Sequence, residues 1–448
     1  MVGKENSGSY RNLSEQFLLT QKDKKGAFNR QYFELYDARL KSLKGRILEN
    51  AENVLGKGNF ECVSLTDVTK TKDVLVIGMI LKKIAAKPSI LKTLLSEDKV
   101  AYEDYEDEEA GDLKRYTENA EDHLEFECDN QTVKLEGNIS MNDCATGCCA
   151  GLFGKLGDED GVFEVIRVIW PKIRVEPIDL KMKMRKSVIA FVSGLELSGD
   201  LEEDNGTISS FEYFGEWLKE EEEMNVERLV VLGPSIDNNV VGCDVESVVR
   251  TLTLSRQDKQ MSTKALTMLD KIISSLTDQL DVDVSAGVGD PCSSLWPQPP
   301  IHRVCLPRSG MTKKQVNLVT NPYEFSLDGI RFLTTSGENI DDLLKTCWKW
   351  KSVDAMENCL KWQHIAPTCP DTLDGFPMAD RDPLIISTTP RFMICGNQSN
   401  CEVRNVALDD RENICTCISI PKFSKSRTIL FLNLEDLTVS WRVFQNDF

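Results

Sequence analysis

The chain has 448 residues, and its 53 Lys and Arg against 72 Asp and Glu give a formal net charge of −19. This length allows two or three domains, and a hydrophobic content of 41% supports packed cores, which excludes a mostly disordered chain. Because folds that bind duplex nucleic acid on their own present a basic surface, the acidic balance argues against autonomous duplex binding.

The sequence also lacks the signals of a membrane or secreted protein. Its longest apolar stretch runs only from Val74 to Leu81, whereas a membrane-spanning helix needs about 20 such residues. Met1–Tyr10 carries charged and polar residues where a signal peptide has an apolar run. We therefore expect a soluble intracellular protein whose 15 cysteines are reduced.

Near the N-terminus, apolar residues recur at steps of three and four, with charged residues between them. They are Tyr32, Tyr36, Leu40, Leu43 and Ile47. This spacing predicts an amphipathic helix over residues 28–47 that ends near Gly45 or soon after.

Short apolar runs separated by Gly, Asn and Asp follow between about residues 62 and 174. They are Val74–Leu81, Ile139–Met141, Cys148–Phe153 and Val162–Trp170. Several short strands joined by loops predict a small barrel or sandwich.

An acidic block interrupts these runs. Between Glu97 and Asp129, 15 of 33 residues are Asp or Glu. Like charges repel one another and the block has few apolar residues to bury, so we interpret residues 97–129 as a solvated loop.

From Ser187 onward, strand-like and helix-like segments alternate. Val188–Val192 and Leu229–Leu232 are β-branched-rich runs typical of buried parallel strands, and helices are expected at Ile208–Leu218, Thr263–Leu280 and Ser336–Lys349. Further strands are expected at Val284–Gly287, Ile330–Thr334, Leu384–Ile386 and Phe392–Ile394, with a closing hairpin of Ile429–Leu434 and Val439–Phe444. The pattern indicates one α/β domain, either doubly wound or a two-sheet sandwich flanked by helices.

Candidate catalytic and metal-binding residues are few. The chain has only three histidines, His123, His302 and His364, and their positions favour structural roles over a Ser-His-Asp or Cys-His set. The cysteines lack the paired CxxC spacing of a zinc site. We therefore expect neither a bound metal nor a cofactor.

A series of strand ends in the second half carries glycine next to polar residues. The series comprises Ser193-Gly194-Leu195, Gly233-Pro234-Ser235-Ile236-Asp237, Gly287-Val288-Gly289-Asp290, Thr335-Ser336-Gly337 and Gly396-Asn397-Gln398-Ser399. Their order and spacing resemble the five motifs of the calcineurin-like metallophosphoesterases, D-x-H, G-D-x-x-D, G-N-H-D/E, a histidine before glycine, and G-H-x-H. In that family these carboxylates and imidazoles hold two metal ions that activate water.

Compared with that pattern, most of the expected metal ligands are replaced. The replacements are Ser193 and Leu195 for the first Asp and His, Pro234 for the bridging Asp, Val288 and Gly289 for Asn and His, Ser336 for the next His, and Asn397 and Ser399 for the last pair. Only Asp237 and Asp290 keep a carboxylate. Two carboxylates without imidazole cannot build the two-metal centre, so the resemblance implies an inactive phosphoesterase scaffold without catalytic residues.

This replacement of metal ligands is typical of one protein family, and further segments along the chain are similar to sequences of that family. They are Phe28–Phe33, Val76–Met79 leading to Lys87–Leu91, Asn321–Tyr323, Asp328–Leu333, Ser336–Asn339, Pro370–Thr372 and Cys395–Gln398. Together they resemble the B subunits of replicative DNA polymerases, and most closely the delta branch of that family.

The resemblance implies a fold and a division of the chain. It implies an oligonucleotide/oligosaccharide-binding (OB) barrel over residues 45–178, packed on a calcineurin-like phosphodiesterase domain, a two-sheet α/β sandwich, over residues 185–448. Residues 1–44 would form an N-terminal segment and helix that pack on the phosphodiesterase-like domain.

The resemblance also implies a nuclear, non-catalytic accessory subunit for DNA replication and repair synthesis. Members of the family connect the polymerase delta catalytic subunit, through its Cys-rich C-terminal tail, to a third regulatory subunit, with DNA contacted weakly or indirectly. A B subunit of polymerase alpha or epsilon is an alternative in the same class. An alternative of another class is a residual metal-dependent phosphodiesterase that uses Asp237 and Asp290.

Overall fold

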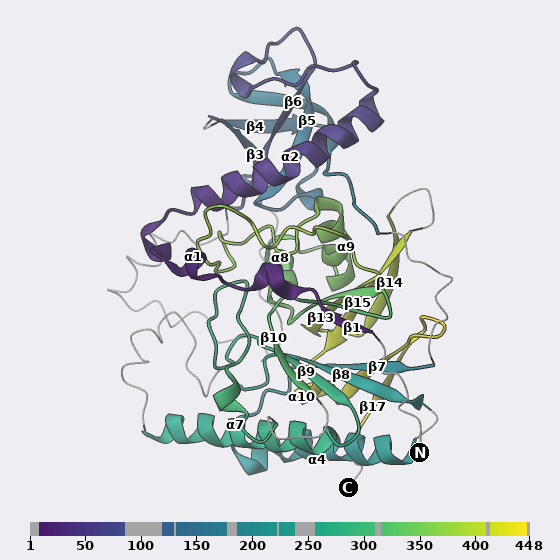
Figure 1. Cartoon of the computed structure of the whole chain (residues 1–448). Helices are drawn as coiled ribbons and strands as arrows, with labels where there is room; N and C mark the ends of the chain where they lie inside the picture. The colour runs from purple at the N-terminus through teal and green to yellow at the C-terminus, as the bar shows by residue number, and fades with distance from the viewer. Residues whose placement is uncertain are drawn as a thin grey trace.

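The computed structural model describes residues 9–85, 119–129, 131–176, 186–221, 224–237, 256–309, 315–408 and 413–445. It contains one closed barrel and two six-stranded sheets. Figure 1 shows the barrel at one end of a larger α/β body, with the long helix α2 along the junction between them.

The barrel is built from five strands in the order β2-β3-β4-β6-β5. Their bounds are β2 Val74–Lys83, β3 His123–Cys128, β4 Gln131–Gly137, β5 Cys148–Leu156 and β6 Val162–Ile169. All neighbouring pairs are antiparallel except β4 and β6, which are parallel. Side chains such as Val76, Phe126, Leu152 and Phe163 fill its interior, so the predicted small β domain is a barrel.

Two expectations for this region were wrong in part. Ile139–Met141 is not a strand but leads into the 3-10 helix Met141–Asp143. The acidic block ends in strand β3, where Leu124 and Phe126 are buried and alternate with the more exposed Glu125 and Glu127. This period of two outweighs the local negative charge. Residues 97–118 of the block lie outside the described residues.

Helix α2, Phe33–Leu55, begins later and ends ten residues beyond Gly45, the predicted end. Ile47 and Ala51, which follow the glycine, pack with Leu75 and Ile169 of the barrel. A Cβ added to Gly151 of β5 would come within 2.8 Å of Ile47, so the helix lies very close to this strand. Tertiary packing of this kind outweighs the cost of about 1 kcal/mol for a glycine inside a helix.

The larger body consists of two sheets packed face to face. One sheet has the order β1-β11-β12-β13-β15-β14, and the other has the order β10-β9-β8-β7-β16-β17. The strands of the first are β1 Tyr10–Asn12, β11 Tyr323–Leu327, β12 Ile330–Thr335, β13 Phe392–Gln398, β14 Glu402–Ala407 and β15 Ile414–Pro421. Those of the second are β7 Val188–Ser193, β8 Val226–Leu232, β9 Asp281–Ser285, β10 Val316–Val319, β16 Thr428–Asn433 and β17 Val439–Val443.

The inner faces of the two sheets share one core. Ile189 and Phe191 of β7 pack there with Phe325, Phe332 and Phe392 of the facing sheet. The alternating residues Val188, Ala190 and Val192 pack on the opposite side, in a cluster that includes α4 and α7 residues. The sandwich alternative of the sequence analysis is therefore the one found.

Helices cover both outer faces of the sandwich. Helices α4 (Leu201–Glu220) and α7 (Arg256–Leu276) cover one face, and α8 (Glu338–Thr346) and α9 (Ser352–Trp362) cover the other. In the part of the chain that the structure describes, α1 Gln21–Lys24 and α10 Phe423–Ser426 are single-turn helices. Helix α9 was not predicted, and Leu384–Ile386 was wrongly predicted as a strand. Within Leu384–Ile386, only a single bridge, between Ile385 and His364, has strand-like pairing.

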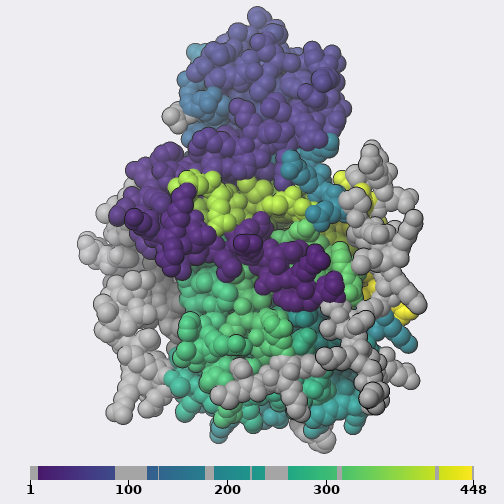
Figure 2. Space-filling model, viewed as in Figure 1, coloured from purple at the N-terminus to yellow at the C-terminus, as the bar shows by residue number. Residues whose placement is uncertain are grey.

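The N-terminal segment crosses the larger body before it reaches the barrel, as the purple band in Figure 2 shows. Strand β1 pairs with β11, and Arg381 donates to the carbonyl of Gln16 at 2.8 Å. The predicted boundary between residues 44 and 45 falls inside α2, which contacts the larger body through Arg39 and Arg46 and the barrel through Ile47 and Ala51. The three domain ranges themselves stay a prediction.

One buried arginine ties α2 to both domains. Arg39 is fully buried and its Nε donates to Asp382 Oδ2 at 2.6 Å. Its other nitrogens donate to the carbonyls of Pro367 and Cys369 in the larger body and of Gly147 just before β5. Arg39 therefore joins helix, barrel and larger body through a single side chain.

His364 completes this cluster. Its Nε2 lies 2.9 Å from Asp382 Oδ2, and its Nδ1 accepts from the Ala366 N–H. Burial, with a further contribution from the Arg39 charge, lowers the pKa of His364 to about 4. Burial alone would raise the pKa of Asp382, but the adjacent Arg39 and His364 hold it below its ordinary value.

Replacing Arg39 by methionine should destabilise the protein strongly. The variant Arg39→Met leaves the buried Asp382 without its partner, a change that typically costs about 3–5 kcal/mol. Urea unfolding followed by circular dichroism measures the loss. The matched control is Lys41→Met, which removes the exposed pair with Asp37 and should cost less than about 0.5 kcal/mol. Equal effects of the two variants would contradict the role of Arg39.

The contribution of His364 to stability should fall as the pH drops from about 6.5 to 4. In that window the unfolded chain protonates His364 but the folded chain does not, because the folded pKa is about 4. The free energy of unfolding then loses up to about 1.4 kcal/mol per pH unit from this group. The free energy of unfolding of the wild type relative to His364→Gln, measured by urea unfolding at several pH values, should therefore fall over this window, whereas its value relative to the control His302→Gln at an exposed site should stay constant. A slope unchanged in His364→Gln would refute this assignment.

Candidate functional site

The polar strand ends found in the sequence come together where the two sheets meet. Strands β7, β8 and β9 are parallel in one sheet, and β12 and β13 are parallel in the other. Their carboxyl ends therefore lie at the same edge of each sheet. Asn397, at the end of β13, contacts residues from three of the other strand ends.

Asn397 connects these ends by hydrogen bonds. Its backbone N–H donates to Ser193 Oγ at 3.1 Å, and its Nδ2 donates to the carbonyls of Gly233 at 2.5 Å and Ser336 at 2.6 Å. Asn397 has a φ of 59°, a left-handed conformation that asparagine tolerates better than most residues. A Cβ on Gly194 would come within 2.2 Å of Asn397 Oδ1, so glycine is required there.

Asp290, one of the two remaining carboxylates, is bound by the backbone. It is 2% exposed, and its oxygens accept from the N–H groups of Ser235 at 2.9 Å, Ile236 at 3.0 Å and Gly287 at 2.9 Å. Burial raises its pKa to about 7 although these donors favour the charged form. Asp290 therefore fixes the loops after β8 and β9 relative to each other.

A second polar group, which the sequence analysis missed, surrounds Ser336. The Ser336 hydroxyl bonds to Glu338 and to the amide of Asn321. Glu338 also accepts from the Val288 N–H at 2.8 Å, and burial raises its pKa above the ordinary value. The Ser336–Asn339 segment had been noted only for its resemblance. No periodicity could have placed Glu338 beside Asn321, because Glu338 begins α8 whereas Asn321 lies in the loop between β10 and β11.

Asp341 adds another carboxyl group at this edge. It accepts from Gln398 Nε2 at 3.1 Å, and burial raises its pKa to about 7. The edge therefore holds Asp290, Glu338 and Asp341, each with a raised pKa, where the sequence had indicated only two aspartates.

The other predicted positions contribute no side chain to these contacts between strand ends. Leu195 is buried in the core beneath α4, and Ser399 is exposed. The Asp237 N–H donates to the carbonyl of Leu197. The Pro234 carbonyl accepts from the Glu196 N–H, Val288 donates its N–H to Glu338, and Gly289 has a φ of 96°.

The donor set does not fit a two-metal centre. Among the described residues, no group of three or more His, Cys, Asp and Glu side chains is placed to hold a metal ion. Metal ligands must be deprotonated, whereas burial raises the pKa of all three carboxyl groups here. The amide of Asn397 is bonded to backbone carbonyls. The polar groups of this arrangement therefore join strand ends.

The cysteines give no other reactive centre in the described part of the chain. Each described cysteine is a free thiol. Burial raises the pKa of Cys144 and of Cys149 to about 12, so these thiols stay protonated. Within the same described residues, no helix is both long and apolar enough to cross a membrane.

Two family models match the chain in the order of its two domains. A model described as the OB-fold domain of the DNA polymerase delta subunit matches residues 31–168, which confirms the predicted OB-fold barrel. A model that describes the B subunit of DNA polymerase alpha/epsilon matches residues 189–403 of the larger body. Fold and models together define a member of the B subunits of the replicative DNA polymerases.

Full-length relatives narrow this class. A probable DNA polymerase delta small subunit from Caenorhabditis elegans is 55% identical, with 98% of each chain covered. DNA polymerase delta small subunits from Oryza sativa subsp. japonica, 28% identical over 98% of each chain, and Saccharomyces cerevisiae, 29% identical over 92% of this chain and 89% of that one, also match. The chain belongs to the DNA polymerase delta small subunit family, and the predicted resemblance to the delta branch is confirmed.

The strand-end contacts of Asn397 should be important for stability. Asn397→Ala leaves the carbonyls of Gly233 and Ser336 without their donor and forces alanine into a left-handed conformation. We expect a loss of about 2–3 kcal/mol in the free energy of unfolding, measured by urea unfolding. The control Ser399→Ala changes an exposed hydroxyl two residues away and should stay within about 0.5 kcal/mol. A loss no larger than that of the control would show that Asn397 does not link the strand ends.

Proposed function

We propose that the chain is a non-catalytic scaffold subunit of DNA polymerase delta that bridges the catalytic subunit and a third regulatory subunit. It would act in the nucleus during DNA replication and repair synthesis. Membership in the small subunit family supports a place in a polymerase complex. The bridging role, the particular partners and the nuclear site are the parts of this proposal that extend beyond the family.

The larger body is, in this proposal, a calcineurin-like phosphodiesterase fold that has lost its metal site. The observation that carries this is the bonding of Asn397, at a position where that family has a metal-binding histidine. Side chains that would face a metal and substrate instead donate to the chain itself. Ser193, whose hydroxyl donates to the Pro421 carbonyl at 3.1 Å, is a second example.

Rigidity between the domains supports a bridging role. A subunit that holds two partners in a fixed geometry needs domains that do not move relative to each other. The Arg39 cluster and the packing of α2 on both domains meet this requirement, because both are buried. The net charge of the chain is negative, which disfavours direct binding to DNA phosphates. In this proposal, DNA is therefore contacted only through the partner subunits.

Affinity purification of the tagged chain from its native cells at moderate salt tests the proposed assembly. We expect the polymerase delta catalytic subunit and one further subunit to elute in equal amounts by quantitative mass spectrometry. Elution of the chain alone, or with the catalytic subunit of polymerase alpha or epsilon, would overturn the proposal.

A second assay tests the residual phosphodiesterase. The purified complex is incubated with Mn²⁺ or Zn²⁺ and bis(p-nitrophenyl) phosphate, with Asp290→Asn as the comparison. A scaffold should give the same background hydrolysis for both proteins. Hydrolysis by the wild type that the Asp290→Asn variant lacks would establish the enzyme alternative.

A further inference from the structure

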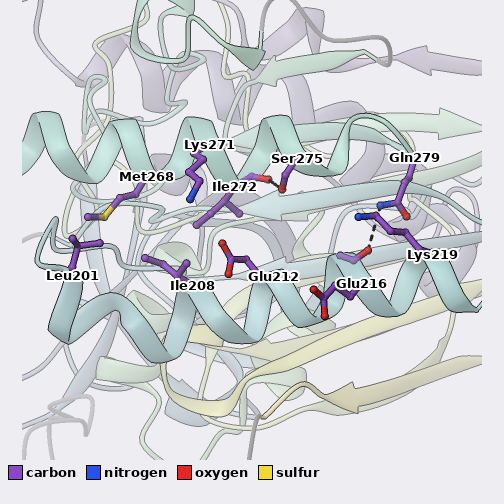
Figure 3. A pocket seen from close by; sticks show the side chains of 11 residues that line it. Leu201, Ile208, Glu212, Glu216, Lys219, Met268, Lys271, Ile272, Ser275 and Gln279 are labelled. Carbon is purple, nitrogen blue, oxygen red and sulfur yellow. Dashed lines mark hydrogen bonds between the residues drawn. The ribbon is translucent and has the colours of Figure 1, made fainter.

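A groove on the outer helical layer lies apart from the strand ends. It runs between α4 and α7, which lie side by side on the sheet of β7, β8 and β9, and it encloses about 350 Å³. Figure 3 shows the side chains of Ile208, Met268 and Ile272 pointing into the space between the two helices. The lining residues are Leu201, Ile208, Glu212, Gly215, Glu216, Lys219, Met268, Lys271, Ile272, Ser275 and Gln279.

The lining residues repeat every seven positions on both helices. On α4, Leu201, Ile208 and Gly215 form one such column. On α7, Met268 and Ser275 form a second, and Gln279 lies in the turn that follows this helix. A seven-residue repeat keeps a groove aligned with a packed helix, as in a coiled coil. The spacing therefore suits a third helix better than an extended peptide.

The groove is long, with an apolar base. Leu201 and Lys219 are 18 residues apart on α4, or about 27 Å at 1.5 Å per residue. Near one end the base is fixed by Gln279, whose Nε2 donates to the carbonyl of Gly215 at 3.3 Å. Leu201 at the other end is 68% exposed, so its side chain is accessible to a partner.

The charged residues are distributed along the walls. Glu212, Glu216 and Lys219 lie on α4, the two glutamates one turn apart, and Lys271 lies on α7. With the other described residues, neither glutamate forms an ion pair. Like charges four residues apart repel, so cations on a bound helix would relieve this repulsion. Small-molecule sites instead gather a few polar groups around one point.

We propose that the α4/α7 groove is the docking site for an amphipathic helix of another subunit of the polymerase complex. Its apolar stripe packs on Ile208, Met268 and Ile272. The edge of the docked helix that lies beside α4 carries two Lys or Arg residues one turn apart, opposite Glu212 and Glu216. An acidic residue on the other edge of the docked helix faces Lys271. This inference rests on the proposed function, because it takes the partner from the same complex.

Charge reversal tests the predicted electrostatics. In the complex assembled from purified full-length subunits, Glu212→Lys/Glu216→Lys should weaken binding of this chain to its partners at least tenfold at physiological salt. The matched control Glu220→Lys/Glu221→Lys makes the same charge change at exposed positions beyond the groove and should leave affinity within twofold. Circular dichroism of each variant verifies that the fold is retained.

Site-specific crosslinking identifies the occupant. A photoreactive benzoylphenylalanine replaces Ser275, which lines the groove, and the crosslinked peptide is sequenced from the assembled complex. We expect one segment of a partner subunit with apolar residues at i, i+3 or i+4, and i+7, and two basic residues on one edge. A control probe at Asp278, at an exposed position outside the groove lining, should not crosslink to that segment.

The outcomes separate the two proposals. If the wild-type complex assembles but charge reversal has no effect, or no amphipathic partner segment crosslinks at position 275, the groove is not the docking site and the scaffold function stands. If the wild-type chain forms no complex with polymerase delta subunits, the scaffold function and the docking site are both overturned.

Discussion

The architecture depends on the burial of one positive charge. Arg39 comes from a helix that belongs to neither domain alone, and its fork of donors is satisfied by Asp382 and by carbonyl groups of both domains. A guanidinium can be removed from water at tolerable cost only if all its neighbours stay in place. The relative position of barrel and sandwich is therefore fixed by electrostatics as well as by apolar packing.

The strand-end edge uses its polar groups in the same way. Asn397, Asp290 and Ser336 bond to groups of neighbouring loops, so polar residues join the two sheets where an enzyme of similar topology would hold ligands. In the proposed scaffold, the residues at the place of an active site therefore stabilise the fold. The proposed docking groove between α4 and α7 lies on the outer surface, so a partner that binds there does not contact the interior of the protein.

Sequence periodicity predicted the elements whose burial repeats regularly. The buried β-branched runs of β7 and β8 and the helix pattern of α7 were recognisable, as was the order of the strand ends that places Ser193, Ser336 and Asn397 together. Strand β3 was obscured by its glutamates, and α9 by the lack of a clear start signal. The contact of Glu338 with Asn321 arises only when β11, β12 and α8 are assembled, so no local pattern encodes it.

The 343 residues between Arg39 and Asp382 have a consequence for synthesis on the ribosome. At about 5–20 residues per second, Asp382 is added roughly 20–70 s after Arg39. By then the barrel strands, on which Ile47 and Ala51 pack, have all emerged, but Arg39 still lacks its partners in the larger body. Strand β1 waits similarly for β11. For most of translation, Arg39 of the nascent chain therefore lacks the groups that neutralise and bind it. We expect chaperones to bind this helix mainly during that period.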